Sequence, residues 1–208
     1  MLYELIVPPG RLWFKVFFKL RVIGLENVPM HGPGLICCNH CSYLDPMVVV
    51  VSFPRKVYSL SRKEIYQQPL LGPIIRRLGA VRIDRGSLAD KDALQAILRI
   101  MDKGNLCIVY PEGTRSYDGR LQPAHNGAAF LAVKSAAPII PVAIIGSYEC
   151  WPRQRKWARP GRITVRIGQP VSYHLPADRE CHKEDLTTIS QDIMAHIRAL
   201  QEQGHGIV

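Results

Sequence analysis

The amino-acid sequence predicts a single α/β domain with a largely parallel sheet. Short apolar runs rich in valine and isoleucine alternate along the chain with segments whose apolar residues recur at helical spacing. Strands that alternate with helices form parallel sheets, because each helix carries the chain back to the same end of the sheet. A length of 208 residues suits one domain, and a composition of 47% hydrophobic and 21% charged residues is ordinary for a folded globular protein. We therefore expect one mixed, largely parallel sheet flanked by helices, with a short N-terminal amphipathic helix.

The individual elements follow from local composition. Strands are predicted where apolar and β-branched residues cluster, at residues 21–26, 34–39, 56–61, 80–84, 105–110, 138–146 and 162–168. Helices are predicted at residues 11–20, 64–77, 87–103 (between a Ser87 cap and Gly104), 126–135 and 185–203. The run MVVVVSF has strand propensity, but Asp45-Pro46 before it is typical of a helix start. We therefore predict a helix after Pro46, with Asp45 as its N-cap.

The N-terminal segment, residues 1–20, is distinguished from the main domain, residues 21–208. Arg11, Lys15 and Lys19 fall on one face of the predicted helix, and aromatic and aliphatic residues cover the rest. This composition suits a membrane interface, and it equally suits a helix packed on the core with three solvated cations. The sequence opens without the pattern of a secretory signal, and no run approaches the ~20 apolar residues of a membrane span.

The overall charge predicts an anionic partner. Lys and Arg total 27 against 17 Asp and Glu, so the net charge is +10. Residues 151–162 combine arginines and a lysine with two tryptophans, a composition of bilayer interfaces and of surfaces that bind single-stranded nucleic acid. The same segment is also compatible with a solvated connection between strands. The six cysteines are too few for a disulfide scaffold, and we expect a reducing compartment.

Residues 36–46, ICCNHCSYLDP, offer several kinds of site. A metal site is disfavoured, because Cys37 and Cys38 are neighbours on a strand and point to opposite faces, and no second ligand pair follows. A Cys41 or Ser42 nucleophile lacks a recognisable nucleophile motif. The remaining possibilities are a catalytic pair, or a loop histidine beside a helix cap.

In the catalytic alternative, His40 and Asp45 form a base and its partner. His40 lies just past a predicted strand, where open α/β sheets place their sites, and Asp45 opens the next helix. A turn between them would bring the carboxylate to one ring nitrogen and leave the other free to accept a proton.

A second group of polar residues follows another buried strand. Residues 109–119, VYPEGTRSYDG, form a predicted loop that carries Glu112, Thr114 and Arg115, and an arginine beside a glycine turn suits binding of a phosphate or carboxylate. Further cations, Arg85, Arg62 and Lys63, follow or end other strands. If these strands are neighbours, a base and several cations share one edge of the sheet.

Four sequence blocks in order resemble the glycerolipid acyltransferases, most closely those that act on 1-acyl-glycerol-3-phosphate. The block NHxxxxD matches Asn39 to Asp45, and a block ending in I/V-D-R matches residues 79–85. F-P-E-G-T-R-S matches residues 110–116, with Tyr110 in place of the usual phenylalanine, and a V/I-P-V block matches residues 139–144. The order and spacings fit from about Val22 to Gly168, which is most of the chain.

The resemblance implies a role for each matched residue. His40 would be the general base that takes a proton from the acceptor hydroxyl, and Asp45 would orient and stabilise it. The resulting oxygen would attack an acyl thioester directly, without an acyl-enzyme. Arg115 would bind the acceptor phosphate, and nearby residues would add positive charge or shape the loop: Arg85, Arg62, Lys63, Glu112, Gly113 and Thr114.

The resemblance implies transfer of a fatty acyl group to the sn-2 hydroxyl of 1-acyl-glycerol-3-phosphate, which gives phosphatidic acid. Acyl-CoA or acyl carrier protein would be the co-substrate, with no cofactor or metal, and the protein would lie on the cytoplasmic face of the cell membrane as a peripheral protein. The alternatives are another lysolipid or lyso-aminolipid acceptor or, in a different class, a basic protein that binds nucleic acid or anionic lipid. The last alternative has no need of His40.

Overall fold

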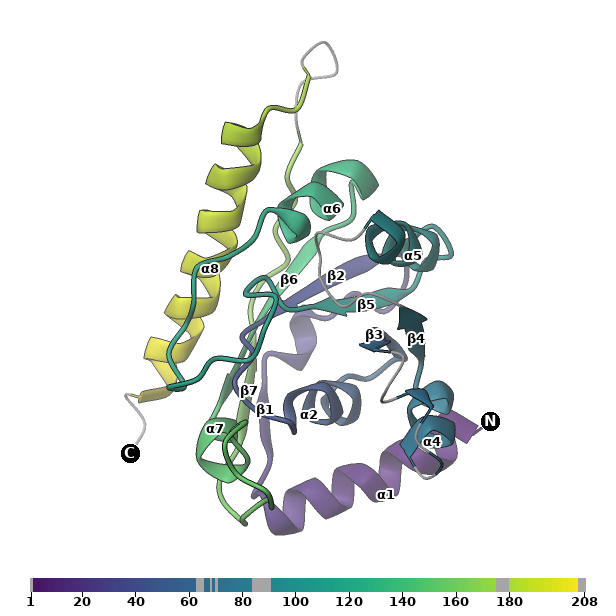
Figure 1. Cartoon of the computed structure of the whole chain (residues 1–208), viewed down its shortest axis with the longest axis vertical. Coiled ribbons are helices and arrows are strands. Elements are labelled where there is room, and N and C mark those ends of the chain that lie inside the picture. Colours follow the sequence, from purple (N-terminus) through teal and green to yellow (C-terminus); the bar gives the residue numbers. More distant parts are fainter. Residues whose placement is uncertain are drawn as a thin grey trace.

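The computed structural model of the protein describes residues 2–62, 66–67, 69, 71–83, 91–174 and 180–205. In this part of the chain, seven strands form one sheet in the order β1-β7-β6-β2-β5-β3-β4 (Figure 1). All neighbouring strands are parallel except the antiparallel pair β6 and β7. The strands are β1 (Arg21–Ile23), β2 (Gly34–Cys38), β3 (Val57–Arg62), β4 (Ala80–Ile83), β5 (Leu106–Val109), β6 (Ile139–Ile145) and β7 (Thr164–Ile167). The predicted fold class, α/β with a largely parallel sheet, is confirmed.

Helices cover both faces of this sheet (Figure 1). Helices α1 (Leu2–Phe17) and α2 (Asp45–Ser52) pack on one face, and α5 (Lys91–Met101), α6 (Gly127–Ser135) and α8 (Lys183–His205) pack on the other. The shorter elements are the 3-10 turn η1 (Leu25–Asn27), α4 (Leu71–Arg77) and α7 (Ser147–Cys150). The core therefore has two halves, one on each side of the sheet.

Strand β2 shows how the sequence divides between these halves. Ile36 and Cys38 lie in the apolar cluster with α1 and α2, while Leu35 and Cys37 lie in the cluster with α5, α6 and α8. All four side chains are buried, as expected for a central parallel strand covered on both faces. The prediction that Cys37 and Cys38 point to opposite faces is confirmed.

Several predicted boundaries differ from those observed. Residues 25–27 are a 3-10 turn rather than strand, because Gly24 at φ 86° turns the chain out of the sheet. The predicted helix 64–77 is interrupted, since residues 67 and 69 lie in a turn and α4 begins at Leu71; Pro69, which has no N–H, disfavours a continuous helix there. The predicted cap Ser87 lies outside the described residues, and Gly104 at φ 73° follows the end of α5.

Helix α1 begins earlier and ends earlier than residues 11–20. It starts at Leu2, contains Pro8 and Pro9, and stops at Phe17. Lys19 lies beyond the helix with a left-handed φ of 43°, so it does not continue the predicted cationic face. Among the helices of the described residues, none combines the length and apolar composition needed to cross a bilayer.

One of the three predicted solvated cations of α1 has a structural role instead. The Arg11 guanidinium donates hydrogen bonds to the carbonyl oxygens of Val51 and Phe53, at 2.7 and 3.1 Å. These carbonyls belong to the C-terminal end of α2, where the last carbonyls of a helix have no partner within the helix. Arg11 therefore attaches α1 to the end of α2.

Candidate active site

The carboxyl ends of three neighbouring strands define the candidate site. Strand β2 lies between β5 and β6 and is parallel to both, with Cys37 opposite Val109 and Pro141. Loops that leave the same end of adjacent parallel strands lie close together. The segment after β2 that carries His40 therefore lies between the loop after β5 and the turn after β6.

His40 and Asp45 form the hydrogen-bonded pair that the sequence predicted. Nδ1 of His40 lies 2.9 Å from Oδ2 of Asp45, whose side chain has no exposed surface, while 16% of the His40 side chain is exposed. Because a carboxylate oxygen only accepts hydrogen bonds, Nδ1 carries the proton in this contact. The second ring nitrogen, Nε2, is then left as the proton acceptor.

Asp45 is held by the turn that precedes it and is not the N-cap of α2. It is the first residue of the helix, Leu44 is the N-cap, and no side-chain cap hydrogen bond is present. Oδ2 of Asp45 instead accepts the backbone N–H groups of Cys41 at 2.8 Å and Ser42 at 2.7 Å. The prediction that Asp45 caps α2 is therefore wrong. Its carboxylate points back toward His40 and the preceding turn rather than toward the N–H groups of its own helix.

Tyr110 positions the imidazole from the opposite side. Its ring stacks on that of His40 with 3.9 Å between centroids and 18° between planes. The Tyr110 hydroxyl is buried and has no hydrogen-bond partner among the described residues, and burial raises the pKa of this phenol. The ring alone makes the stacking contact, so phenylalanine at this position would serve the same purpose.

Glu112 joins the loop after β5 to the backbone of His40. Its Oε1 accepts the N–H of His40 and its Oε2 accepts the N–H of Gln122, both at 2.8 Å. In return, the His40 carbonyl accepts the N–H of Ser116 at 2.7 Å. Burial raises the pKa of Glu112 to about 7, although the two backbone hydrogen bonds act in the opposite direction.

The remaining predicted loop residues have distinct environments. Gly113 has φ 69°, and a Cβ there would lie 2.8 Å from His125, so both backbone and space require glycine. Thr114 is exposed. The Arg115 guanidinium lies 3.7 Å above the ring of Tyr43, three residues after His40, and this contact places Arg115 at the same sheet edge as the base.

The other predicted cations lie outside what the structure describes. Arg62 ends β3, but its side chain and the whole of Lys63 and Arg85 are beyond the described residues. Sequence reasoning did not assign Arg153 to the site. Its guanidinium donates to the Arg115 carbonyl oxygen at 3.3 Å, so it lies beside the same loop.

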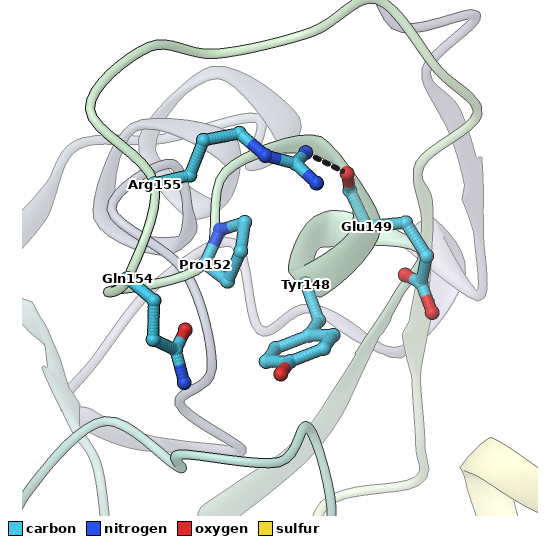
Figure 2. Close-up of a pocket in the computed structure, with 5 residues that line it drawn as sticks. All are labelled: Tyr148, Glu149, Pro152, Gln154 and Arg155. Carbon is cyan, nitrogen blue, oxygen red and sulfur yellow. Dashed lines mark hydrogen bonds between the residues drawn. The ribbon is translucent and has the colours of Figure 1, made fainter.

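An open pocket of about 520 Å³ lies in the segment after β6. Figure 2 shows the five residues that line it, Tyr148, Glu149, Pro152, Gln154 and Arg155. Arg155 donates to the Glu149 carbonyl at 2.7 Å, and the hydroxyl of Tyr148 donates to the carbonyl of Tyr117 at 2.9 Å. The second of these bonds joins the segment after β6 to the Arg115 loop. The pocket does not include the His40–Asp45 pair.

The alternative nucleophiles are poorly placed for attack. Burial raises the pKa of the Cys41 thiol, which opposes formation of a thiolate, and its Sγ faces Ser147 Oγ at 3.3 Å. The hydroxyl of Ser42 donates to the carbonyl of Trp151 at 2.8 Å, so its proton is not directed to His40. In the described part of the chain, no three His, Cys, Asp or Glu side chains form a group that could hold a metal ion.

Two polar residues of the site were not assigned from sequence. Asn39 is buried and bridges β2 to β6, where its side-chain amide exchanges two hydrogen bonds with the backbone of Ile144, at 2.7 and 3.0 Å. Ser147 donates from Oγ to Oδ1 of Asp45 at 2.6 Å. Asn39 belongs to the first matched block, whereas Ser147 lies beyond the last one and carries no sequence signal of its own.

The raised pKa of Glu112 predicts a pH-dependent cost to stability. The unfolded chain releases this proton near pH 4.5 and the folded protein only near pH 7. Stability therefore falls as pH rises through this interval, by roughly 3 kcal/mol, since each pKa unit is about 1.4 kcal/mol. We expect the free energy of unfolding of the wild type, relative to Glu112→Gln, to decrease from pH 5 to pH 8 in urea titrations.

Glu202→Gln, which removes an exposed carboxylate, is the control. If the difference in the free energy of unfolding between the wild type and Glu112→Gln does not change with pH, the assignment is contradicted.

The chain matches known proteins over most of its length. The family described as Acyltransferase matches residues 19–145. A 1-acyl-sn-glycerol-3-phosphate acyltransferase of Cocos nucifera is 33% identical over 66% of this chain and 46% of its own length, and one of Bacillus subtilis is 24% identical over 91% and 94%. The chain thus spans about half the length of the plant relatives it matches.

A solved structure also matches this chain. Compared with the crystal structure of the 1-acyl-sn-glycerophosphate (LPA) acyltransferase of Thermotoga maritima, this chain has a TM-score of 0.76 and a sequence identity of 25%, and the match covers 97% of this chain and 81% of that one. The family match covers more than half of the chain and includes the His40, Asp45 and Arg115 segments, so this protein belongs to the acyltransferase family.

Proposed function

We propose that this protein transfers a fatty acyl group from an acyl thioester to the sn-2 hydroxyl of 1-acyl-glycerol-3-phosphate, which produces phosphatidic acid. The observation that carries the proposal is the His40–Asp45 pair, in which a buried carboxylate directs one ring nitrogen and leaves Nε2 to accept a proton. The relatives named as 1-acyl-sn-glycerol-3-phosphate acyltransferases support this acceptor.

In the proposed mechanism, Nε2 of His40 takes the proton of the acceptor hydroxyl as its oxygen attacks the thioester carbonyl. Asp45 stabilises the imidazolium that forms, through the bond from Nδ1 to Oδ2. The carbon–sulfur bond then breaks, and the thiol of the donor leaves with the proton returned by His40. The reaction uses the thioester as co-substrate, either acyl-CoA or acyl carrier protein, and we propose no cofactor or metal for it.

We propose that Arg115 binds the phosphate of the acceptor. Guanidinium groups bind phosphate with two parallel hydrogen bonds, and the contact with Tyr43 holds the Arg115 guanidinium at the sheet edge that carries His40. Arg62, Lys63 and Arg85 add positive charge in this proposal. Gly113 and Thr114 shape the loop that presents the arginine.

Replacement of His40 tests the reaction. We expect His40→Ala to lower kcat about a hundred- to ten-thousand-fold, the range attributed to general-base catalysis. The assay measures thiol release and phosphatidic acid from purified protein, 1-acyl-glycerol-3-phosphate and acyl-CoA or acyl carrier protein. His196→Ala, on the exposed face of α8, is the matched control. Equal activity in the wild type and His40→Ala, or none in either, refutes the proposal.

Replacement of Arg115 tests the choice of acceptor. We expect Arg115→Gln to raise KM for 1-acyl-glycerol-3-phosphate by about ten- to a hundred-fold, as expected for loss of a hydrogen bond between charged groups. Arg120→Gln removes an exposed arginine from the same loop and should leave KM unchanged. A panel of other lysophospholipids and lyso-aminolipids accompanies the assay. If a lipid without a terminal phosphate is the better acceptor and Arg115→Gln does not affect it, the phosphate assignment is wrong.

We also propose that the protein binds the cytoplasmic face of the membrane as a peripheral protein, through α1 and residues 151–162. On α1, one set of apolar side chains is exposed: Leu5, Leu12, Trp13, Val16 and Phe17. Residues 151–162 adjoin the end of this helix, because Gly161 donates to the carbonyl of Phe17 at 3.3 Å and Ile163 to that of Phe18 at 2.8 Å. Trp157 is 73% exposed and lies among arginines and a lysine, so the combined surface is both apolar and cationic.

Vesicle binding tests this surface. We expect the wild type to co-sediment with phosphatidylglycerol vesicles more strongly than with phosphatidylcholine vesicles, and we expect Phe17→Ser and Trp157→Ser to weaken binding several-fold each. Phe130→Ser, which changes a partly exposed phenylalanine of α6 on the opposite face of the sheet, is the control. If oligonucleotides displace the protein from the vesicles, the membrane proposal fails. It also fails if Phe17→Ser and Trp157→Ser weaken vesicle binding no more than Phe130→Ser does.

A further inference from the structure

The two oxygens of the buried Asp45 carboxylate have different surroundings. Oδ2 accepts three hydrogen bonds, from Nδ1 of His40 and from the backbone N–H groups of Cys41 and Ser42. In the described part of the chain, Oδ1 accepts one hydrogen bond, from the hydroxyl of Ser147 at 2.6 Å. This distance is typical of a charge-assisted bond between a hydroxyl and a carboxylate.

The fold determines the position of Ser147 closely. It lies one residue beyond the turn glycine that follows β6, has no exposed surface and is the first residue of α7. It is 102 residues away from Asp45 in the sequence. The turn before it requires Gly146, which has φ 86° and whose Cβ would lie only 2.0 Å from the carbonyl oxygen of Arg162. The hydroxyl of Ser147 is therefore delivered to Asp45 by a core strand and a constrained turn.

We propose that Ser147 is a positioning residue that acts on His40 through Asp45. The two backbone donors fix the place of Oδ2, and Ser147 fixes the rotation of the carboxylate about that point by binding Oδ1. Oδ2 is then held toward Nδ1 of His40 throughout proton transfer. The inference rests on the proposed role of His40 as the base.

A purely structural role for Ser147 predicts a different result. In that case, loss of the hydroxyl would lower stability and leave the catalytic step intact. A positioning role predicts that kcat falls while KM for the acceptor and the donor remains unchanged, because nothing in the proposal brings Ser147 into contact with substrate.

The test compares Ser147→Ala with Ser190→Ala, which removes another buried serine hydroxyl, one that donates to Asn126 from α8. We expect Ser147→Ala to lower kcat about ten- to a hundred-fold without a change in KM, the size expected for one hydrogen bond to a charged group. Ser147→Thr, which keeps the hydroxyl, should restore part of the rate. Ser190→Ala should leave kcat unchanged whatever it does to the melting temperature.

A double-mutant cycle identifies Asp45 as the intermediary. If Ser147 acts through the Asp45 carboxylate, Ser147→Ala should lower kcat much less in an Asp45→Asn background than in the wild type. Full additivity of the two effects, or a wild-type kcat in Ser147→Ala, overturns the proposal.

A spectroscopic measurement makes the test independent of acyl transfer. The Nδ1 proton of His40, bonded to a carboxylate, should give a downfield proton resonance that is lost in His40→Gln and displaced in Ser147→Ala, but not in Ser190→Ala. If the wild type transfers no acyl group, the proposed function fails, and the position of this resonance still decides whether Ser147 controls the His40–Asp45 contact. An unmoved resonance in Ser147→Ala overturns the inference.

Discussion

The burial of the Asp45 carboxylate is the constraint on which the candidate site depends. An ionised group with no exposed surface is tolerated only when hydrogen-bond donors replace the water it has lost. Here the donors come from the turn after β2, from the imidazole of His40 and from the segment after β6. The carboxylate receives all of these hydrogen bonds only if that turn is closed and β6 lies beside β2. The strand order and the geometry of the base therefore depend on the same set of hydrogen bonds.

A second buried carboxylate extends the same principle to β5. Glu112 accepts one backbone N–H from His40 and another from Gln122, and it thereby joins the Arg115 loop to the turn that carries the base. The two acids together connect three adjacent strand ends. Both connections need a chain that turns sharply at a glycine with positive φ, at Gly113 in one loop and at Gly146 in the other. The geometry of the site is thus set largely by backbone groups, and comparatively few side chains adjust it.

The sequence was informative where local pattern and sheet topology determine the outcome. Alternating strands and helices predicted the parallel sheet. The position of His40 after an apolar strand left its pairing with Asp45 as one of two alternatives, and the Arg115 loop and the four matched blocks favoured it. The direction of the Asp45 side chain was not predictable from the Asp-Pro pattern, because capping the helix and binding the preceding turn both satisfy a carboxylate at a helix start. Ser147 was missed for a different reason. Its partner lies 102 residues away, and the contact exists only because β6 returns beside β2.

The N-terminal helix shows why composition alone could not choose between core packing and a membrane interface. Apolar residues surround most of α1, and the structure divides them: Phe14 is buried in the core, while Trp13 and Phe17 are exposed. Arg11 then binds the C-terminal carbonyls of α2, the helix whose first residue is Asp45. A single short helix therefore has the proposed base partner at one end and α1 at the other. Because α2 has only 8 residues, the contact with α1 and the contact with His40 lie on the same short helix. If α1 rests on a bilayer as proposed, α2 connects the helix at the lipid surface to the carboxylate that binds His40.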